Sequence, residues 1–563
     1  MASSALLILL LAQAPNALDA WLNAEAEKRF AERDQAIASI DSKGKVLLRA
    51  ARARLGLPIQ GIPTKASLKA KVIRRFEREG YTVENLTFQS LPGFVVSANL
   101  YLPKQRSGKV PAILGVAGHS NNGKANATYQ KAWIGFVRRG WAVLAYDPPG
   151  QGERLEYFDP ALGKSSVGPG VPEHNMAGLQ CLLTGRPIAH YFVQDGIRAI
   201  DYLLTRPEID PERIGVAGNS GGGTQAAYLA AVEPRLRAAV SSCYMTSWKQ
   251  LWKSPGPQDA EQILPGLLER GFDFADFAYA NTVRPFLITS AIQDYFPIQG
   301  ARDAHAEMKR LMSLLDQPTK FGFFEFDDTH GWSQPRREAA VRWFSRWFDG
   351  RETDGAEAAS ETEEDKVLQA SANGLVTVKS VADLNRKHAA ESRKQWKAPT
   401  RQALERVLRM PADPPASSLR TVKTDAKVEV MSLESVASGP KSGGYSYDYQ
   451  VAARAWLLGT SVPAIETAAA LRKIRELTKQ GKKVWLHAKG SMVPVAVFLA
   501  ALEPGIERVA LEGGIRSYQE IVDARLHSGQ ALAIVPGILE HFDLTELNRL
   551  SKARFTEGAP DWL

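Results

Sequence analysis

The chain reads RIGVAGNSGGGTQAAYLAAVEP from Arg213 to Pro234. An apolar run leads into a Gly-x-Ser-x-Gly turn centred on Ser220, and a segment of helical period follows the turn. The turn motif alone is weak evidence in a chain that has 45 glycines. Between a strand and a helix, however, it is typical of a nucleophile elbow, a strained turn that tolerates only small neighbours. We therefore predict that Ser220 is a catalytic nucleophile.

Similar apolar runs recur on both sides of this motif, and most of them are separated by segments of helical period. The runs are Pro111 to Ala117, Trp141 to Tyr146, Arg213 to Ala217, Leu236 to Ser242, Pro285 to Ser290 and Phe321 to Phe326. This alternation predicts an α/β protein with a mainly parallel sheet. Ahead of it, alternating residues from Tyr81 to Leu102 predict two antiparallel strands joined at Pro92-Gly93.

A serine hydroxyl is a poor nucleophile near neutral pH, so it needs a histidine base and a carboxylate that orients the histidine. After an elbow of this kind the chain order is serine, acid, histidine. Asp294 follows the fifth apolar run and His330 follows the sixth, which places both at the carboxyl ends of parallel strands. We predict a catalytic triad of Ser220, Asp294 and His330.

Three other residues compete for these roles. Asp327 and Asp328 are alternative acids, but they precede His330 so closely that turning back onto its ring is awkward. His119 is an alternative base, and its place on the loop after the first apolar run favours a role in the pocket instead. Alone, each predicted triad member would be read as a cap, a turn former or a surface residue.

The oxyanion of an acyl-transfer reaction needs preorganised backbone donors. The N–H of Gly221, directly after the nucleophile, is the first predicted donor. The second is expected from the loop Gly118 to Lys124, at His119. His119 could alternatively serve only to cap this loop.

Four residues near these segments are expected at the rim of the pocket, where a structural role is an equally open alternative. They are Arg154, Glu173, His174 and Trp332. Arg154 ends the segment DPPGQGER, whose glycines are no dinucleotide-binding fingerprint because prolines occupy positions where phosphate-binding amides are required.

The segment GRPIAHYFVQDGIRAIDYLLTRPEIDPERIGVAGNSGGG, Gly185 to Gly223, resembles bacterial acetylxylan esterases and cephalosporin-C deacetylases of the α/β-hydrolase superfamily. The DPPGQGER and DDTHGW segments share this resemblance, which extends over about Tyr81 to Gly350. The resemblance implies an α/β-hydrolase fold and a serine esterase that removes acetyl or other small acyl groups from sugars or polysaccharides. It implies no metal and no organic cofactor.

Two alternatives of function remain open. A serine peptidase of the prolyl-oligopeptidase type uses the same order of triad residues, but such enzymes generally carry a β-propeller. The residues ahead of Tyr81 are too few to hold four or more four-stranded blades. A carbohydrate-binding protein without catalytic activity is the second alternative, and the complete set of triad residues argues against it.

The C-terminal region repeats part of the first domain at an offset of 270 residues. Ile214 to Pro234 reads IGVAGNSGGGTQAAYLAAVEP, and Val484 to Pro504 reads VWLHAKGSMVPVAVFLAALEP. Gly490 occupies the position of Ser220, and Ser491 lacks small neighbours. The chain ends before a counterpart of the acid or the base. We predict an internal duplication whose second copy is truncated and catalytically inactive.

Five segments are expected. Residues 1–14 resemble a secretory signal peptide without its usual basic residue, although a buried first helix is the alternative. Helices are expected over 15–80, the catalytic domain over 81–350, an acidic solvated linker over 351–395, and the degenerate repeat over 396–563. The signal peptide would imply a secreted or periplasmic protein.

Bulk composition excludes several classes of protein. The net charge of +9 is spread along the chain without a basic tract, which argues against a nucleic-acid partner. The sequence contains no stretch of 18 or more apolar residues, so membrane insertion is not predicted. The two cysteines, Cys181 and Cys243, are too few for a disulfide scaffold, and a single disulfide between them is left as an open alternative. The expected partner is a small-molecule or polysaccharide ester, and the oligomeric state is not predicted.

Overall fold

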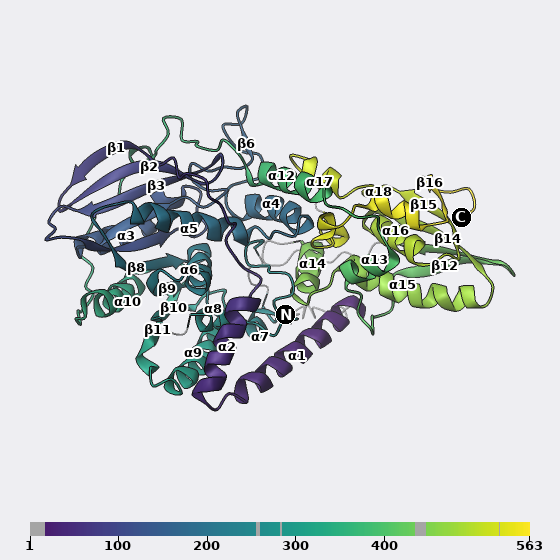
Figure 1. Ribbon diagram of the computed structural model, residues 1–563, viewed down its shortest axis with the longest axis horizontal. Coiled ribbons are helices and arrows are strands. Elements are labelled where there is room, and N and C mark those ends of the chain that lie inside the picture. Colours follow the sequence, from purple (N-terminus) through teal and green to yellow (C-terminus); the bar gives the residue numbers. More distant parts are fainter. Residues whose placement is uncertain (1–16, 255–258, 282–283, 434–445, 529) are drawn as a thin grey trace, which may run out of the picture.

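The computed structural model has a larger lobe and a smaller lobe, each built around its own sheet (Figure 1). It describes residues 17–254, 259–281, 284–433, 446–528 and 530–563. The predicted signal peptide lies outside the described residues.

The larger lobe contains a nine-stranded sheet in the order β1-β2-β3-β5-β4-β8-β9-β10-β11. Its strands are β1 Lys71–Arg78, β2 Tyr81–Leu91, β3 Phe94–Pro103, β4 Val110–Val116, β5 Ala142–Tyr146, β8 Ile209–Asn219, β9 Leu236–Ser242, β10 Phe286–Gln293 and β11 Phe321–Thr329. The first three pair antiparallel, whereas β5, β4 and β8 to β11 are mutually parallel. The predicted mainly parallel sheet is confirmed, and so is the hairpin about Pro92-Gly93.

Helices cover both faces of this sheet. On one face α3 (Ala127–Arg138) and α10 (Gln334–Phe344) pack on strands with a core of aromatic residues. On the other, α5 (Ala189–Leu204) and α6 (Gly221–Val232) pack on strands and on each other. α4 (Val171–Leu183), α7 (Trp248–Leu251), α8 (Phe274–Tyr279) and α9 (Ile298–Ser313) complete this lobe. Burial of the sheet on both faces explains why its parallel strands read as continuous apolar runs.

The smaller lobe contains a five-stranded sheet in the order β12-β13-β14-β15-β16. The strands are β12 Leu419–Thr424, β13 Val428–Leu433, β14 Lys483–Lys489, β15 Ile506–Glu512 and β16 Arg554–Glu557. Strands β13 to β16 are parallel, in the order in which β4, β8, β9 and β10 lie in the first sheet. The helices are α13 Arg401–Leu408, α14 Tyr447–Leu457, α15 Val462–Lys479, α16 Val493–Leu502, α17 Gln519–Asp523 and α18 Leu544–Leu547.

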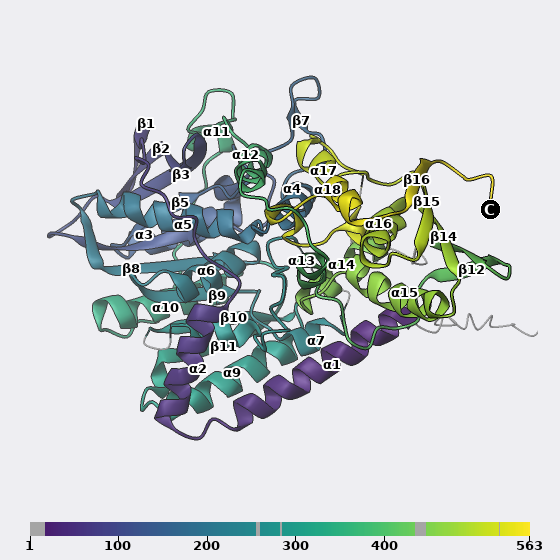
Figure 2. The ribbon, with the colours of Figure 1, turned by 45° about the vertical axis from the view of Figure 1, so that its right-hand side comes forward.

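The N-terminal helices are α1 (Ala17–Ala38) and α2 (Lys43–Gly56). Helix α1 runs along both lobes (Figure 2). Trp21 of α1 donates a hydrogen bond to the Asp413 carbonyl of the smaller lobe, and Arg33 pairs with Asp276 of the larger lobe. The helical prediction over 15–80 is wrong beyond Gly56, because 71–78 form the edge strand β1. Antiparallel pairing with β2, from Lys71 opposite Thr87 to Arg78 opposite Tyr81, holds this strand in spite of its charged composition.

The predicted solvated linker, 351–395, instead packs against the larger lobe. Its carbonyl groups at Val367 and Gln369 accept hydrogen bonds from Asn85 on β2. Its acidic residue Glu357 pairs with Arg337 at 2.6 Å. The short helix α11 (Asp365–Leu368) and the helix α12 (Val381–Arg393) lie within it. The composition misleads because these acidic side chains meet arginines of the folded domain rather than water.

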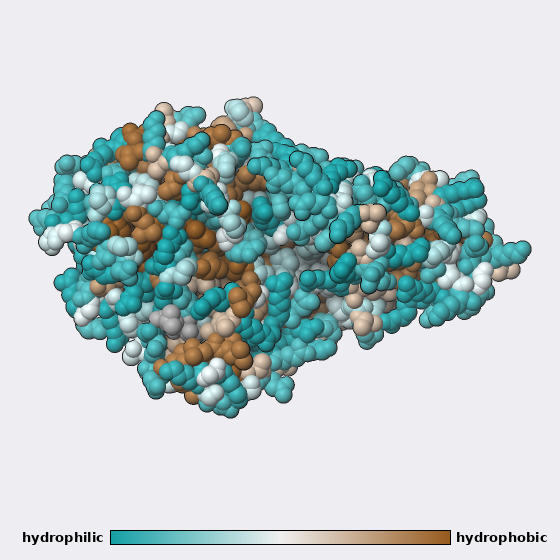
Figure 3. Space-filling view, in the orientation of Figure 1, coloured by the Kyte–Doolittle hydropathy of each residue, from teal (hydrophilic) through white to brown (hydrophobic). Residues whose placement is uncertain are grey.

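The face drawn in Figure 3 is mostly hydrophilic, with apolar patches that gather on the larger lobe. Among the described residues, no helix is both long and apolar enough to cross a bilayer.

Candidate active site

Ser220 lies at the sharp turn between β8 and α6, with φ 59° and ψ −127°. This left-handed conformation strains a residue with a side chain. The turn also needs its glycines, because a Cβ at Gly222 would lie 2.1 Å from the Val116 carbonyl oxygen and one at Gly218 would lie 2.5 Å from Gly222. The Ser220 N–H donates to the Ser242 carbonyl at 2.9 Å. The sequence thus folds locally into the strained strand–turn–helix geometry that the predicted elbow requires.

Asp294 and His330 meet at the carboxyl edge of the same sheet. Asp294 directly follows β10, and His330 directly follows β11. Oδ1 of Asp294 lies 2.8 Å from Nδ1 of His330. The carboxyl group is almost fully buried, at 2% exposure, whereas the ring is 21% exposed. Since one ring nitrogen faces the carboxylate, the other is left to face a nucleophile.

The rival acids are engaged elsewhere. Asp328 pairs with Arg336 at 3.1 Å, and Asp327 accepts a hydrogen bond from the Gln293 amide at 2.8 Å. Neither bond involves the histidine ring. The geometry therefore favours Asp294 as the partner of His330.

Tyr295, which the sequence analysis did not single out, lies against the predicted catalytic residues. Its ring stacks on the His330 ring with centroids 4.1 Å apart. Burial raises the pKa of Tyr295, and a hydrogen bond with the Ser220 side chain opposes this rise. The residue directly follows Asp294 in the sequence, and this adjacency is the one signal that could have identified it.

Both cysteines are buried and free. Cys243 follows β9 with φ 49° and offers its sulfur within 4.8 Å of ligand atoms of Asp294 and His330. Burial and the neighbouring Asp294 raise the pKa of the Cys243 thiol to about 12. The thiol is therefore protonated at neutral pH, which argues against a role as nucleophile.

His119 lies on the loop after β4, with its ring against the elbow. A Cβ at Gly221 would lie 2.9 Å from His119 Cε1. The Nε2 atom of His119 is 3.1 Å from Nδ1 of His174 and 2.9 Å from Oε1 of Glu261. These three side chains form a group whose ligand atoms lie within 4.8 Å of one another. No sequence pattern pointed to Glu261, which lies on an irregular segment.

Charge governs the ionisation of this group. Burial by itself would lower the pKa of His119, but the carboxylates of Glu261 and Asp259 outweigh burial and raise it to about 9. Burial would raise the pKa of Glu261, yet the facing rings of His119 and His174 lower it well below its usual range. At neutral pH the group therefore carries a proton on His119 rather than on the Glu261 carboxylate.

The four residues expected at the rim are all buried, so this expectation needs correction. Arg154 pairs with Asp195 at 2.5 Å, and its guanidinium packs over Phe94. Glu173 accepts hydrogen bonds from the backbone N–H groups of residues 156 and 157. His174 is 1% exposed, and Trp332 packs among the aromatic residues of the α3 face. Partners distant in sequence, polar for the three charged or polar residues and aromatic for Trp332, explain their burial.

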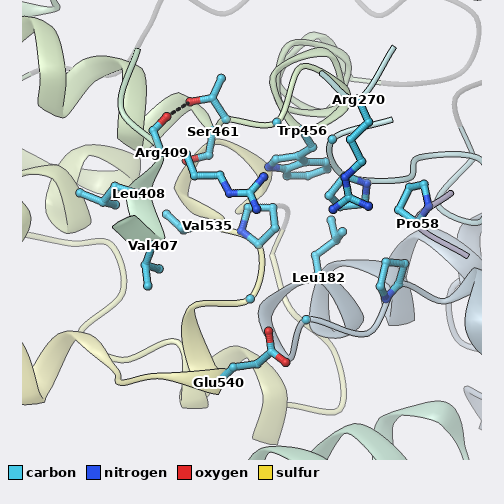
Figure 4. Close-up of a pocket in the computed structure, with 18 of the residues that line it drawn as sticks. Pro58, Leu182, Arg270, Val407, Leu408, Arg409, Trp456, Ser461, Val535 and Glu540 are labelled. Carbon is cyan, nitrogen blue, oxygen red and sulfur yellow. Dashed lines mark hydrogen bonds between the residues drawn. The ribbon is translucent and has the colours of Figure 1, made fainter. Parts of the chain in front are cut away.

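A cavity of about 520 Å³ lies between the two lobes (Figure 4). Arg270 and Leu182 of the larger lobe line it together with Arg409, Trp456 and Glu540 of the smaller lobe. None of the described residues that line it belongs to the predicted triad. This cavity is therefore separate from the nucleophile elbow.

Residues 64–261 match the family model for acetyl xylan esterase, and residues 188–349 match the model for the prolyl oligopeptidase family. Each match covers less than half of the chain, and both include Ser220. The acetyl xylan esterase match confirms the resemblance that the motifs indicate. The family matches support an enzyme of the hydrolase class.

YtaP of Bacillus subtilis (strain 168), a protein named as a hydrolase, is 24% identical over 303 residues, which cover 51% of this chain and 95% of YtaP. The solved structure of methylesterase BT1017 matches with a TM-score of 0.50 and 20% identity, over 66% of this chain and 81% of that chain. At such low identity the structural likeness shows the fold alone, and that fold is the predicted α/β-hydrolase.

Proposed function

We propose that the chain is a serine carboxylic-ester hydrolase that forms an acyl-enzyme, with acetylated sugars or polysaccharides as substrates. The observation that carries the proposal is the Asp294–His330 pair at the sheet edge where Ser220 stands on its strained turn. An oriented histidine and a serine hydroxyl at one edge of the sheet are the parts that acyl transfer requires.

In the proposed mechanism, His330 takes the proton from the Ser220 hydroxyl as the oxygen attacks the ester carbonyl. Asp294 holds Nδ1 of the ring, so Nε2 is the nitrogen that accepts this proton. The imidazolium then protonates the leaving alcohol. A water molecule, deprotonated by the same nitrogen, releases the acid and restores the serine.

The oxyanion is proposed to bind backbone N–H groups of Gly221 and His119. Gly221 is the first residue of α6, and the first N–H groups of a helix have no acceptor within it. The His119 loop lies directly beside this helix terminus, because a Cβ at Gly118 would come within 3.0 Å of Ser220 Cβ. Donors at these two positions would stabilise developing negative charge at the reacting carbonyl.

The prolyl oligopeptidase match keeps a serine peptidase as the second candidate. Fluorophosphonate labelling tests the activated serine that both candidates share. A panel of acetylated sugars, uronic-acid methyl esters, aryl esters of increasing acyl length and prolyl peptides then separates them. Deacetylation without peptide cleavage supports the esterase, and peptide cleavage alone would overturn it. A chain that neither labels nor hydrolyses would instead support the carbohydrate-binding alternative.

The smaller lobe is proposed to be the inactive second copy of a duplicated domain. Gly490 has φ 54°, close to the φ of 59° at Ser220, so a positive φ recurs at the position where the serine is replaced. The backbone twist after the next strand recurs as well, at Cys243 with φ 49° and Gly513 with φ 61°. Each of these pairs is separated by 270 residues.

A capping motif also recurs at the same offset. Asp273 caps α8 and accepts from the Trp248 N–H, whereas Asp543 caps α18 and accepts from the Tyr518 N–H. A long-range contact of this kind repeats only where the surrounding fold repeats. This pattern supports duplication more strongly than helix composition does.

Contacts between the lobes are reciprocal, as in a two-fold dimer. The N–H of Gly266 donates to the Trp456 carbonyl, and the N–H of Gly537 donates to the Leu182 carbonyl, both at 2.8 Å. We infer that the second copy covers a surface of the first in the manner of a partner subunit. The cavity of Figure 4 is lined by these same segments.

Secretion stays a proposal that rests on the predicted signal peptide.

A further inference from the structure

A buried carboxylate beside the elbow faces two imidazole rings. Glu261 is 1% exposed, and its oxygens lie 2.9 Å from His119 Nε2 and 3.3 Å from His174 Nδ1. Among the described residues, neither oxygen makes a hydrogen bond of acceptable geometry. An ionised carboxylate without such bonds is costly to bury. A cation held between this carboxylate and the two rings would offset that cost.

The spacing of the three side chains is close to the edges of a metal coordination shell. The distance from His119 Nε2 to His174 Nδ1 is 3.1 Å, and Glu261 places Oε1 2.9 Å from the first nitrogen and Oε2 3.3 Å from the second. One ligand atom from each residue lies within 4.8 Å of the other two. Zinc bonds to nitrogen and oxygen are about 2.0 to 2.2 Å long, so tetrahedral ligand atoms stand roughly 3.3 to 3.6 Å apart. Because the two rings face different oxygens of Glu261, binding through a single oxygen would require rotation of the carboxylate and of the rings.

The outer contacts of both rings suit ligands as well. Nε2 of His174 lies 2.8 Å from the Pro149 carbonyl, so it carries the proton, and the Nδ1 lone pair points toward His119 Nε2 at the centre of the group. Nδ1 of His119 faces the Asp259 carboxylate at 3.7 Å, while Nε2 faces the centre of the group. Metal-binding histidines are commonly oriented by a carbonyl or carboxylate on the far nitrogen.

We propose that His119, His174 and Glu261 bind one divalent transition-metal ion, with zinc as the reference occupant. Two imidazoles and a carboxylate are a known zinc-ligand set that leaves a coordination position open. The ion would anchor the loop whose His119 N–H is the proposed oxyanion donor, and its positive charge would stand beside the elbow. This proposal differs from the expectation, drawn from the family resemblance, that the protein binds no metal. Binding does not depend on the proposed ester hydrolysis.

The test uses the full chain, stripped with a chelator and titrated with cobalt(II), whose visible absorption reports tetrahedral nitrogen and oxygen ligands. The expected result is about one bound ion per chain, displaced by zinc, with the same stoichiometry by elemental analysis. Glu261→Gln and His174→Ala should abolish binding. His541→Ala, in the wall of the cavity between the lobes, is the matched control and should bind like the parent chain.

Ser220→Ala separates this inference from the proposed function, because it should lose ester hydrolysis and still bind the ion. Titration of the parent chain needs no variant, so a misfolded Glu261→Gln protein would not obscure the answer. A parent chain that takes up neither cobalt nor zinc would overturn the proposal, as would cluster variants that bind as much metal as the parent. The side chains would then be a hydrogen-bonded imidazolium network.

Discussion

Asp294 Oδ1 lies 2.8 Å from His330 Nδ1, although the two residues end different strands of the larger sheet. Asp328, only two positions from His330 in sequence, is instead held by Arg336 on α10. One carboxylate therefore orients the ring and the other anchors a helix. Substitutions at these positions should separate the two roles.

Ser220→Ala is expected to abolish hydrolysis of an aryl acetate without unfolding the chain, because it removes the proposed nucleophile and leaves the elbow glycines in place. The loss is measured as turnover, with circular dichroism as the check on folding. Ser491→Ala, in the second copy, is the matched control and should leave turnover unchanged. Retention of most activity in the Ser220 variant would refute the assignment.

Asp294→Asn should lower turnover by roughly 10⁴-fold, because an amide favours the wrong tautomer of the partner histidine. The binding of substrate should change far less. Asp328→Asn is the comparison, and it should affect thermal stability more than turnover because its partner is Arg336. Should the Asp328 variant prove the slower enzyme, the acid is misassigned.

A chain that ends at Gly350 should lose solubility or melt at a lower temperature than the full chain. It loses the 351–395 segment that pairs with Asn85 and the smaller lobe that hydrogen-bonds to Leu182 and Gly266. A chain that ends at Gln395 keeps the first set of contacts, so its melting temperature should fall between the other two. Unaltered melting temperature and activity in the shorter chain would show that the C-terminal region is an independent appendage.

Lys124→Met should destabilise the larger lobe by about 3 to 5 kcal/mol, because it leaves two buried carboxylates without their cation. The Lys124 amine lies 2.6 Å from Asp147 and 2.8 Å from Glu153, and all three side chains are buried. Calorimetry measures the fall in melting temperature. Adding Glu153→Gln to this variant should recover part of the loss, and a double variant no more stable than the single one would contradict the account.

His190→Gln should flatten the dependence of stability on pH in mild acid. Burial lowers the pKa of His190 to about 4, so between pH 6.5 and pH 4 the unfolded chain binds a proton that the folded chain does not. The parent chain therefore loses stability as pH falls through this window, by about 2 kcal/mol from this group at pH 5. Melting temperatures of both proteins at pH 7.5 and pH 5 measure the difference. Equal losses in the two proteins would contradict the prediction.

Local patterns were enough to predict much of the first lobe. Apolar runs of four to eight residues predict strands wherever both faces are buried, and most of the predicted runs lie in strands of the sheet. The Gly-x-Ser-x-Gly turn identifies the elbow because the steric requirement is met by adjacent residues. The 270-residue offset is likewise visible in sequence because duplicated segments keep their order.

Long-range contacts decided the rest. Composition over 351–365 indicates a solvated linker, yet Arg337 and Arg78 on other elements pair with its acids. Edge pairing with β2 makes 71–78 a strand although its own residues suit a helix. Burial of Arg154 depends on Asp195, which is distant in sequence. In each case the residue whose contact stabilises the folded state lies far away in the sequence, so the local sequence pattern does not contain it.

The sequence by itself determined the succession of strands and helices along the chain, the turn at Ser220 and the presence of one acid and one histidine after later strands, because these follow from neighbouring residues. The sequence favoured Asp294 over Asp328 as the partner of His330, and the tertiary structure supplied the contact itself. Only the tertiary structure decided that Glu261 faces His119 and His174. Such meetings depend on how strands and loops converge at one edge of a sheet, and sequence spacing carries no measure of that distance.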